Sequence, residues 1–244
     1  MKRIKDRTVD GAAPLIVVSG TVCDERLYQP VIDRLDHTGE ILFAPLDVGR
    51  SMPEAAAAFL ARAPSRFLLV GFSLGGIASF EIIAQAPERV AGLCLIDTTP
   101  RPDPPANGPL RDAVRGKARR DGMEGYITDA WPRLVARANL ENHALRRTII
   151  NMAVDCGVDL LDVQTEMAIH RADSRPRLGV IACPTMVLAG AEEKVCPIDA
   201  HREIADGVAG AAFHLIEGAG HFSPLENPRA VASHVQHWLD ACAA

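Results

Sequence analysis

The chain lacks the long apolar runs that would mark a membrane span or a signal peptide. No stretch approaches the roughly 20 apolar residues that a bilayer crossing needs, and no apolar segment follows the charged start, Met-Lys-Arg-Ile-Lys-Asp-Arg. The six cysteines include no C-x-x-C pair, which argues against a zinc site and against a disulfide scaffold. We therefore expect a reduced cytoplasmic protein that uses no metal or other cofactor and no membrane.

The chain also lacks the basic excess of a nucleic-acid-binding protein. Its net charge is −5, which gives no reason to expect nucleic acid as a partner. Of its 244 residues, 48% are hydrophobic, enough for a sizeable core in one large domain or in one domain with an insertion. A small molecule is the expected partner, and the oligomeric state is left open.

Short apolar runs alternate with helical stretches along most of the chain. Near-continuous apolar runs are typical of parallel strands buried on both faces, so the pattern predicts an α/β fold with an open, mostly parallel sheet. The expected strands are 15–19, 41–46, 67–72, 90–96, 185–189 and 212–216, and the expected helices include 54–63, 74–86 and 228–239.

One segment interrupts this alternation. Residues 100–178 contain no convincing strand, begin with a proline-rich loop and then become helical and charged. We interpret them as a helical insertion between two parts of the core, residues 1–99 and 179–244. The dense charge in 111–120 is expected to be a solvated helix face.

Gly71-Phe72-Ser73-Leu74-Gly75 matches the pattern G-x-S-x-G. An apolar strand runs into it and a helix leaves it, which is the setting that a nucleophile elbow requires. Small residues are needed where the sharp turn brings backbone segments together, and the helix start places free N–H groups near the serine. Ser73 is therefore the predicted nucleophile.

A serine hydroxyl needs an adjacent base, and His221 is the predicted one. It lies in a glycine-rich loop just past the last expected strand, where loops of an open α/β sheet form binding sites. We expect His214, inside a strand, to be a packed core residue. His234 and His237, on the last helix, are expected at surface or packing positions, and His37, His143, His170 and His201 have no such setting.

A catalytic histidine is oriented by a carboxylate, and the expected chain order is serine, acid, histidine. Glu193, or its neighbour Glu192, lies in the loop after the penultimate strand. Asp97, at the end of an earlier strand, is the alternative acid.

An oxyanion hole requires two N–H donors. The N–H of Leu74, directly after the nucleophile, is one. The other is expected in the loop after the first apolar strand, with Thr21 as the first choice and Val22 as the second.

These motifs together resemble the α/β-hydrolase superfamily. The specific matches are GFSLGG at 71–76, APERV at 86–90 and GAGHFSPLENP at 218–228. The acid loop, 190–197, resembles the family pattern with Glu193 where aspartate is usual, which favours Glu193 over Asp97. Ser19-Gly20 stands where the family usually has His-Gly.

The resemblance implies an α/β-hydrolase fold with a shortened, mostly parallel sheet of about six strands. It also implies that residues 100–178 form a helical cap before the penultimate strand, shaping the substrate pocket. Trp131 in this segment and Phe222 beside the histidine are the candidate pocket residues.

The likeness is greatest to small bacterial serine esterases, including methyl ester esterases and lactonases. It implies hydrolysis of a small carboxylic ester or lactone through an acyl-enzyme on Ser73. The alternatives are C–C bond hydrolysis or lyase chemistry, cofactor-free perhydrolysis, and a ligand-binding receptor that retains the triad.

Overall fold

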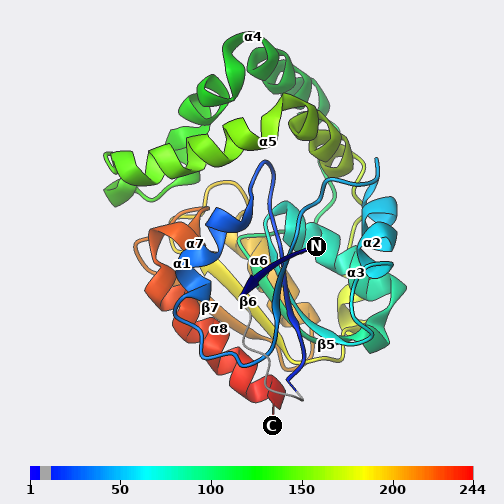
Figure 1. The fold of residues 1–244 in the computed structure, drawn as a ribbon. Coiled ribbons are helices and arrows are strands. Elements are labelled where there is room, and N and C mark those ends of the chain that lie inside the picture. Colours follow the sequence, from blue (N-terminus) through cyan, green and yellow to red (C-terminus); the bar gives the residue numbers. More distant parts are fainter. Residues whose placement is uncertain (6–11, 244) are drawn as a thin grey trace.

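The computed structural model describes residues 1–5 and 12–243, and these form one sheet with helices on both faces (Figure 1). The strand order is β1-β3-β2-β4-β5-β6-β7, with β1 antiparallel to β3 and all other neighbours parallel. The strands are β1 (Lys2–Lys5), β2 (Leu15–Val18), β3 (Ile41–Ala44), β4 (Phe67–Phe72), β5 (Val90–Ile96), β6 (Thr185–Gly190) and β7 (Ala212–Ile216). The expected mostly parallel α/β architecture is confirmed.

The sheet has seven strands in the described residues, one more than the six expected. The extra strand, β1, pairs along the outer edge of β3 with Lys2 opposite Phe43. Its sequence, KRIK, contains no apolar run, and Lys2 and Arg3 are exposed at this edge of the sheet. The signal used to find the other strands is therefore absent here.

Helices cover both faces of the sheet. They are α1 (Gln29–Ile32), α2 (Met52–Leu60), α3 (Leu74–Gln85), α4 (Asn107–Leu134), α5 (His143–Ile169), α6 (Ile198–Gly207), α7 (Ser223–Glu226) and α8 (Pro228–Ala243), with short 3₁₀ turns at Glu25–Leu27, Pro87–Arg89, Arg137–Asn139 and Arg175–Val180. In the described residues, none of these helices is both long enough and apolar enough to cross a bilayer.

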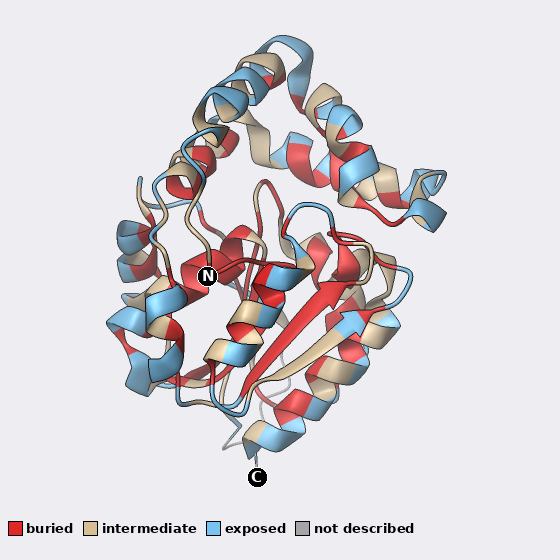
Figure 2. Cartoon of the chain, turned by 180° about the vertical axis from the view of Figure 1, so that it is seen from behind, coloured by how far each residue is buried: buried red, intermediate tan, exposed pale blue. Residues whose placement is uncertain are grey.

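Alternate residues of each inner strand supply two separate hydrophobic clusters. In β4, Leu68 and Val70 belong to the cluster that includes Trp238 of α8, whereas Phe67 and Leu69 belong to the one that includes Phe80 of α3. Both faces of the strand are thus buried, which explains its continuous apolar sequence. Figure 2 shows the buried strands between helices whose outer faces are exposed.

Residues 100–178, called the insertion below, leave the core after β5 and return to it before β6. Helices α4 and α5 pack against each other above the end of the sheet where the parallel strands terminate (Figure 1). The charged face of α4 is held by ion pairs of Arg115 with Glu166 and of Arg119 with Asp162, both across to α5. Whether the insertion is a separate domain stays a prediction.

Both insertion helices are kinked at a glycine. Gly122 in α4 has φ +79° and ψ +171°, and Gly157 in α5 has φ +80° and ψ +167°. This backbone region is open essentially to glycine alone. The two kinks bend the pair of helices so that it arches over the sheet (Figure 1).

Alanine at either kink should destabilise the protein by about 1–3 kcal/mol, since a Cβ is strained in that backbone conformation. Apart from the adjacent residues and the backbone of the same helix, no heavy atom lies within 4 Å of the added Cβ at Gly122 or Gly157, so the cost comes from the local backbone conformation. Urea unfolding of Gly122→Ala and Gly157→Ala measures it. Gly116→Ala is the matched control in α4, where alanine should stabilise the helix by about 0.5–1 kcal/mol. Equal or greater stability of the kink variants would contradict this reading.

Candidate active site

Ser73 lies at the sharp turn between the central strand β4 and α3. Its backbone has φ +50° and ψ −114°, a strained conformation for a residue other than glycine. The turn is so tight that a Cβ on Gly71 would collide with Ser79 Oγ, and one on Gly75 would collide with the carbonyl oxygen of Val18. The expected close approach at both glycines is confirmed.

Two further contacts fix the backbone of Ser73. Its N–H donates to the carbonyl oxygen of Ile96 at 2.9 Å, and its own carbonyl accepts from Thr98 Oγ1 at 2.7 Å. Ile96 is the last residue of the neighbouring strand β5, and Thr98 lies two residues beyond it. The carbonyl of Ser73 also accepts the N–H of Ile77 in α3 at 3.1 Å, so the strained serine is held both from the end of β5 and from the helix start.

His221 reaches Ser73 from the loop that follows β7. Its Nε2 lies 3.0 Å from Ser73 Oγ, and the residue is 5% exposed. The imidazole packs against the ring of Phe72, with 5.2 Å between centroids. The structure thus brings together the two residues that the sequence predicts as nucleophile and base.

Glu193 lies on the other side of the imidazole. Its Oε2 accepts from His221 Nδ1 at 2.5 Å, and its Oε1 accepts the N–H of Val195 and of Cys196. Of the candidate acids, Glu193 is the one in contact with the histidine. The loop that carries Glu193 thus also fixes its carboxylate, through the backbone N–H groups of Val195 and Cys196.

The pKa values of this pair move in opposite directions. Burial alone lowers the pKa of His221, but the charge and hydrogen bond of Glu193 outweigh it and the pKa is raised. Burial likewise raises the pKa of Glu193, and the charge and hydrogen bond of His221, with the two backbone N–H groups, outweigh it and leave the pKa lowered. The arrangement favours an imidazolium beside a carboxylate.

Asp97 is buried near this pair but does not contact His221. Its Oδ1 accepts the N–H of Gly190 at 2.8 Å, and its Oδ2 accepts the N–H and the hydroxyl of Ser223 at 3.2 and 2.6 Å. Burial, and then the charge of Glu193, raise the pKa of Asp97 well above its ordinary value. Asp97 therefore links the acid loop to the histidine loop.

The third candidate acid, Glu192, is also engaged elsewhere. Its Oε2 accepts the N–H of Arg137, in the short 3₁₀ turn of the insertion, at 2.9 Å. The residue consequently binds the insertion to the acid loop and not to the histidine.

The loop after β2 lies beside the nucleophile. A Cβ on Gly20 would be 3.2 Å from the Cβ of Ser73. The N–H of Val22 donates to Gln164 Oε1 at 2.8 Å, so this second-choice oxyanion donor is already engaged. Leu74 is the first residue of α3, where helix geometry provides no acceptor for its N–H. Thr21 and Leu74 stay the predicted donors.

Glu226 is a residue that the sequence patterns did not single out as functional. Its carboxylate accepts the N–H of Gly220 at 2.8 Å and, from the insertion, the N–H of Ala136 at 2.7 Å and Asn139 Nδ2 at 2.8 Å. It thus joins the histidine loop to the insertion. The only available signal was its place within the motif GAGHFSPLENP.

His201 is a second missed residue, since a lone histidine on a helix gave no signal. It is fully buried, its Nε2 accepts the N–H of Thr98 at 2.9 Å, and its Nδ1 faces the carbonyl of Pro197 at 3.1 Å. Burial lowers the pKa of His201 to about 4, so the ring is neutral at neutral pH. It therefore supports, through Thr98, the carbonyl contact on Ser73.

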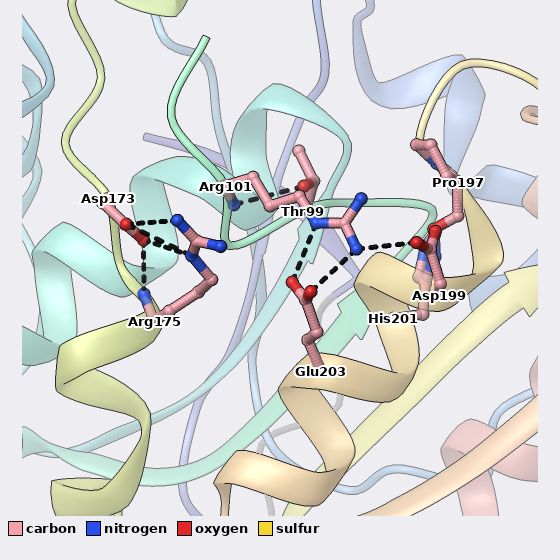
Figure 3. Close-up of polar contacts among 8 residues, drawn as sticks. All are labelled: Thr99, Arg101, Asp173, Arg175, Pro197, Asp199, His201 and Glu203. Atoms are coloured by element: carbon pink, nitrogen blue, oxygen red, sulfur yellow. Dashed lines mark hydrogen bonds and ion pairs between the residues drawn. The ribbon is translucent and has the colours of Figure 1, made fainter. Parts of the chain in front are cut away.

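An ion-pair cluster next to His201 ties the start of the insertion to α6 (Figure 3). Arg101 forms a two-point contact with Glu203 and a further one with Asp199, each at 2.8 Å. The segment after β5, which bonds to Ser73 through Thr98, is thereby held to α6 at two points, by His201 and by the ion pairs of Arg101.

The two candidate pocket residues are both buried. Trp131 is 4% exposed and its indole N–H donates to the carbonyl of Leu140 at 2.9 Å within the insertion. Phe222 lies beside His221, and its N–H donates to the carbonyl of Leu134 at 3.2 Å. Contact of either with substrate stays a prediction, and the indole contact shows that Trp131 also packs the insertion.

His214 was expected in the core, and this is wrong. Strand β7 is an edge strand, so His214 is only half-buried and stacks on His234 of α8 with ring centroids 4.3 Å apart. Within residues 1–5 and 12–243, no group of three or more His, Cys, Asp or Glu side chains is placed to hold a metal ion.

Residues 17–234 match the family model described as the alpha/beta hydrolase family, and the chain therefore belongs to that family of hydrolases. It is 23% identical over 241 residues to the biotin biosynthesis bifunctional protein BioHC of Cellvibrio japonicus, a match covering 94% of this chain and 48% of that protein. The chain thus spans about half the length of this relative.

Two solved structures share the fold across nearly the whole chain. A thermophilic esterase from Thermogutta terrifontis has a TM-score of 0.85 at 24% identity, covering 100% of both chains. The enol-lactonase from Burkholderia xenovorans LB400 has a TM-score of 0.84 at 23% identity, covering 96% of this chain and 94% of that one. At these identities the likeness shows the fold.

The contacts predict different effects for the two buried carboxylates. Glu193→Gln removes the charge facing His221 and should lower kcat for ester hydrolysis by about 10³–10⁴-fold, as in other triads that lose their acid. Because that charge raises the pKa of His221, the acid limb of the pH profile of kcat/KM should also move to lower pH.

Asp97→Asn is the matched control, because it makes the same change of group without touching the imidazole. It should cost about 1–3 kcal/mol of unfolding free energy through its weakened contacts to Gly190 and Ser223, with less than about a tenfold loss of kcat. Loss of turnover in Asp97→Asn with near-normal kcat in Glu193→Gln would overturn the assignment of the acid.

Proposed function

We propose that this protein is a serine hydrolase that cleaves a small carboxylic ester or lactone through an acyl-enzyme on Ser73. The single observation that carries the proposal is the continuous contact from Ser73 Oγ through the imidazole of His221 to the carboxylate of Glu193. A hydroxyl, a base within hydrogen-bond reach and a group that orients the base are the parts that acyl transfer requires.

In the first half-reaction, Ser73 Oγ attacks the substrate carbonyl carbon and His221 Nε2 takes the hydroxyl proton. The carbonyl oxygen becomes an oxyanion, which accepts from the N–H groups of Leu74 and Thr21. Glu193 stabilises the imidazolium that forms. The C–O bond to the leaving alcohol then breaks, and the imidazolium returns the proton to the departing oxygen.

In the second half-reaction, water replaces the alcohol. His221 takes a proton from the water, the hydroxide oxygen attacks the acyl carbon, and Ser73 leaves with the proton returned by the imidazolium. In a lactone the leaving alkoxide stays attached to the acyl group, so ring opening releases one hydroxy acid.

Ester or lactone cleavage fits the chain better than the other readings. An esterase and a lactonase share its fold over nearly its whole length. Glu193 fixes the tautomer of His221, and a receptor that only binds a ligand would not need this. C–C bond hydrolysis would demand, in addition, protonation of a carbanion leaving group, and no observation of this site favours it.

We further propose that the insertion, residues 100–178, is a cap that closes the substrate pocket, with Trp131 and Phe222 on the pocket side. The support is its hydrogen bonding to the loops of the site: the carbonyl of Leu134 accepts the N–H of Phe222, and the N–H of Ala136 donates to Glu226. A cap bound to these loops shields the acyl-enzyme from bulk water on that side.

A panel of short-chain p-nitrophenyl esters, aryl esters and lactones tests the proposal. The wild type should show steady turnover, with kcat/KM falling as pH drops through the raised pKa of His221, because only the neutral imidazole accepts the proton. Ser73→Ala and His221→Ala should each lose turnover by several orders of magnitude.

His214→Ala is the matched control, because it removes a histidine from the same end of the chain but outside the site. It should retain kcat and lose some stability. Full activity in Ser73→Ala, or no turnover by correctly folded wild type, would refute the proposal.

A further inference from the structure

The loop beside the nucleophile contains a strained residue. Val22 has φ +45°, in the left-handed region, although its branched Cβ disfavours that conformation. Strain of this kind persists where the surroundings hold the backbone in place. The contact that holds Val22 in this conformation therefore also helps to fix the backbone of the loop formed by residues 20–23.

Gln164 of α5 holds Val22. The residue is 1% exposed, its Oε1 accepts the N–H of Val22 at 2.8 Å, and its Nε2 donates to the carbonyl of Leu46 at 3.1 Å. One partner is a donor and the other an acceptor, so a single orientation of the amide satisfies both. Both polar atoms of this side chain from the insertion are thus hydrogen-bonded, one of them to the loop beside the nucleophile.

The remaining groups of the loop are also fixed. The carbonyl of Thr21 accepts from Cys23 Sγ at 3.2 Å, so the peptide group between Thr21 and Val22 is held at both ends. The carbonyl of Gly20 accepts the N–H of Cys23 at 3.3 Å. Because the N–H and C=O of one peptide group point in opposite directions, the N–H of Thr21 is directed away from Cys23.

We propose that Gln164 is a positioning residue for the oxyanion hole: by holding Val22 in its strained conformation, it fixes the direction of the Thr21 N–H. The inference rests on the proposed function, since it concerns the oxyanion of that reaction. Gln164 does not touch the reacting atoms. Its effect passes through the backbone of a loop whose Gly20 lies against Ser73.

Two substitutions separate positioning from simple packing. Gln164→Leu removes the acceptor for Val22, whereas Gln164→Glu keeps an acceptor oxygen there but buries a carboxylate that also faces the carbonyl of Leu46. We expect kcat to fall at least about tenfold in Gln164→Leu and less in Gln164→Glu, with KM little changed. Stability should follow the opposite order, because a buried carboxylate is costly.

Phenylboronic acid gives a second readout, because its adduct on Ser73 places an oxygen at the oxyanion position. Its inhibition constant should rise in Gln164→Leu by about the same factor as kcat falls. Thr165→Val is the matched control in α5, since the Thr165 hydroxyl donates to the carbonyl of Leu161 within the helix, and it should keep both values within about twofold.

Val22→Gly removes the strain that Gln164 opposes, because glycine adopts a positive φ without a Cβ penalty. In that background, Gln164→Leu should reduce kcat by a smaller factor than it does with Val22 present. Equal factors in both backgrounds overturn the proposal, as does a parallel loss of kcat and stability across the Gln164 variants.

The outcomes distinguish this inference from the proposed function. Turnover by wild type with unchanged kcat and boronate inhibition in Gln164→Leu overturns the positioning role alone. Absence of both turnover and boronate binding in folded wild type overturns the proposed function, and the positioning role with it.

Discussion

The rest of the site depends on the two hydrogen-bonding contacts of the His221 imidazole. One nitrogen faces Ser73 and the other faces Glu193, so three loops from different strands meet on one ring. Each loop follows a parallel strand, and the carboxyl ends of these strands lie at the same edge of the sheet. The ring is buried, and the charge of Glu193 offsets the burial that would otherwise lower its pKa.

Two side chains that do not contact His221, Asp97 and Glu226, hold the loops of the site in place. Asp97 accepts hydrogen bonds from Gly190, at the start of the acid loop, and from Ser223, two residues after His221. Glu226 accepts hydrogen bonds from Gly220 and from the insertion. The oxygens of each accept from several donors, so replacing either side chain disturbs two segments at once. The precise approach of His221 to Ser73 thus depends on groups that never touch the serine.

The sequence predicted the loops of the site better than it predicted their supports. Ser73 and His221 lie in motifs with distinctive glycine spacing, and the fold brings the two side chains together. The family pattern of the acid loop favoured Glu193 over Asp97, but both follow strands, and side-chain geometry is what shows that Glu193 contacts the imidazole.

Other features could not be predicted from the hydrophobic pattern or the motifs of the sequence. Strand β1 has no apolar run, and Gln164 lies in a helix whose sequence gives no reason to single it out. The function of such a residue depends on a contact with Val22, 142 residues away in sequence, which periodicity does not encode.

The most direct measurement is the identity of the acylated residue. The protein would be mixed with a p-nitrophenyl ester whose acyl group is released slowly, quenched in acid, digested and analysed by mass spectrometry. The account predicts a burst of about one p-nitrophenol per chain, as expected when an acyl-enzyme accumulates, with the acyl mass on the peptide containing Ser73. Acylation of another residue, or turnover without a covalent intermediate, would contradict it.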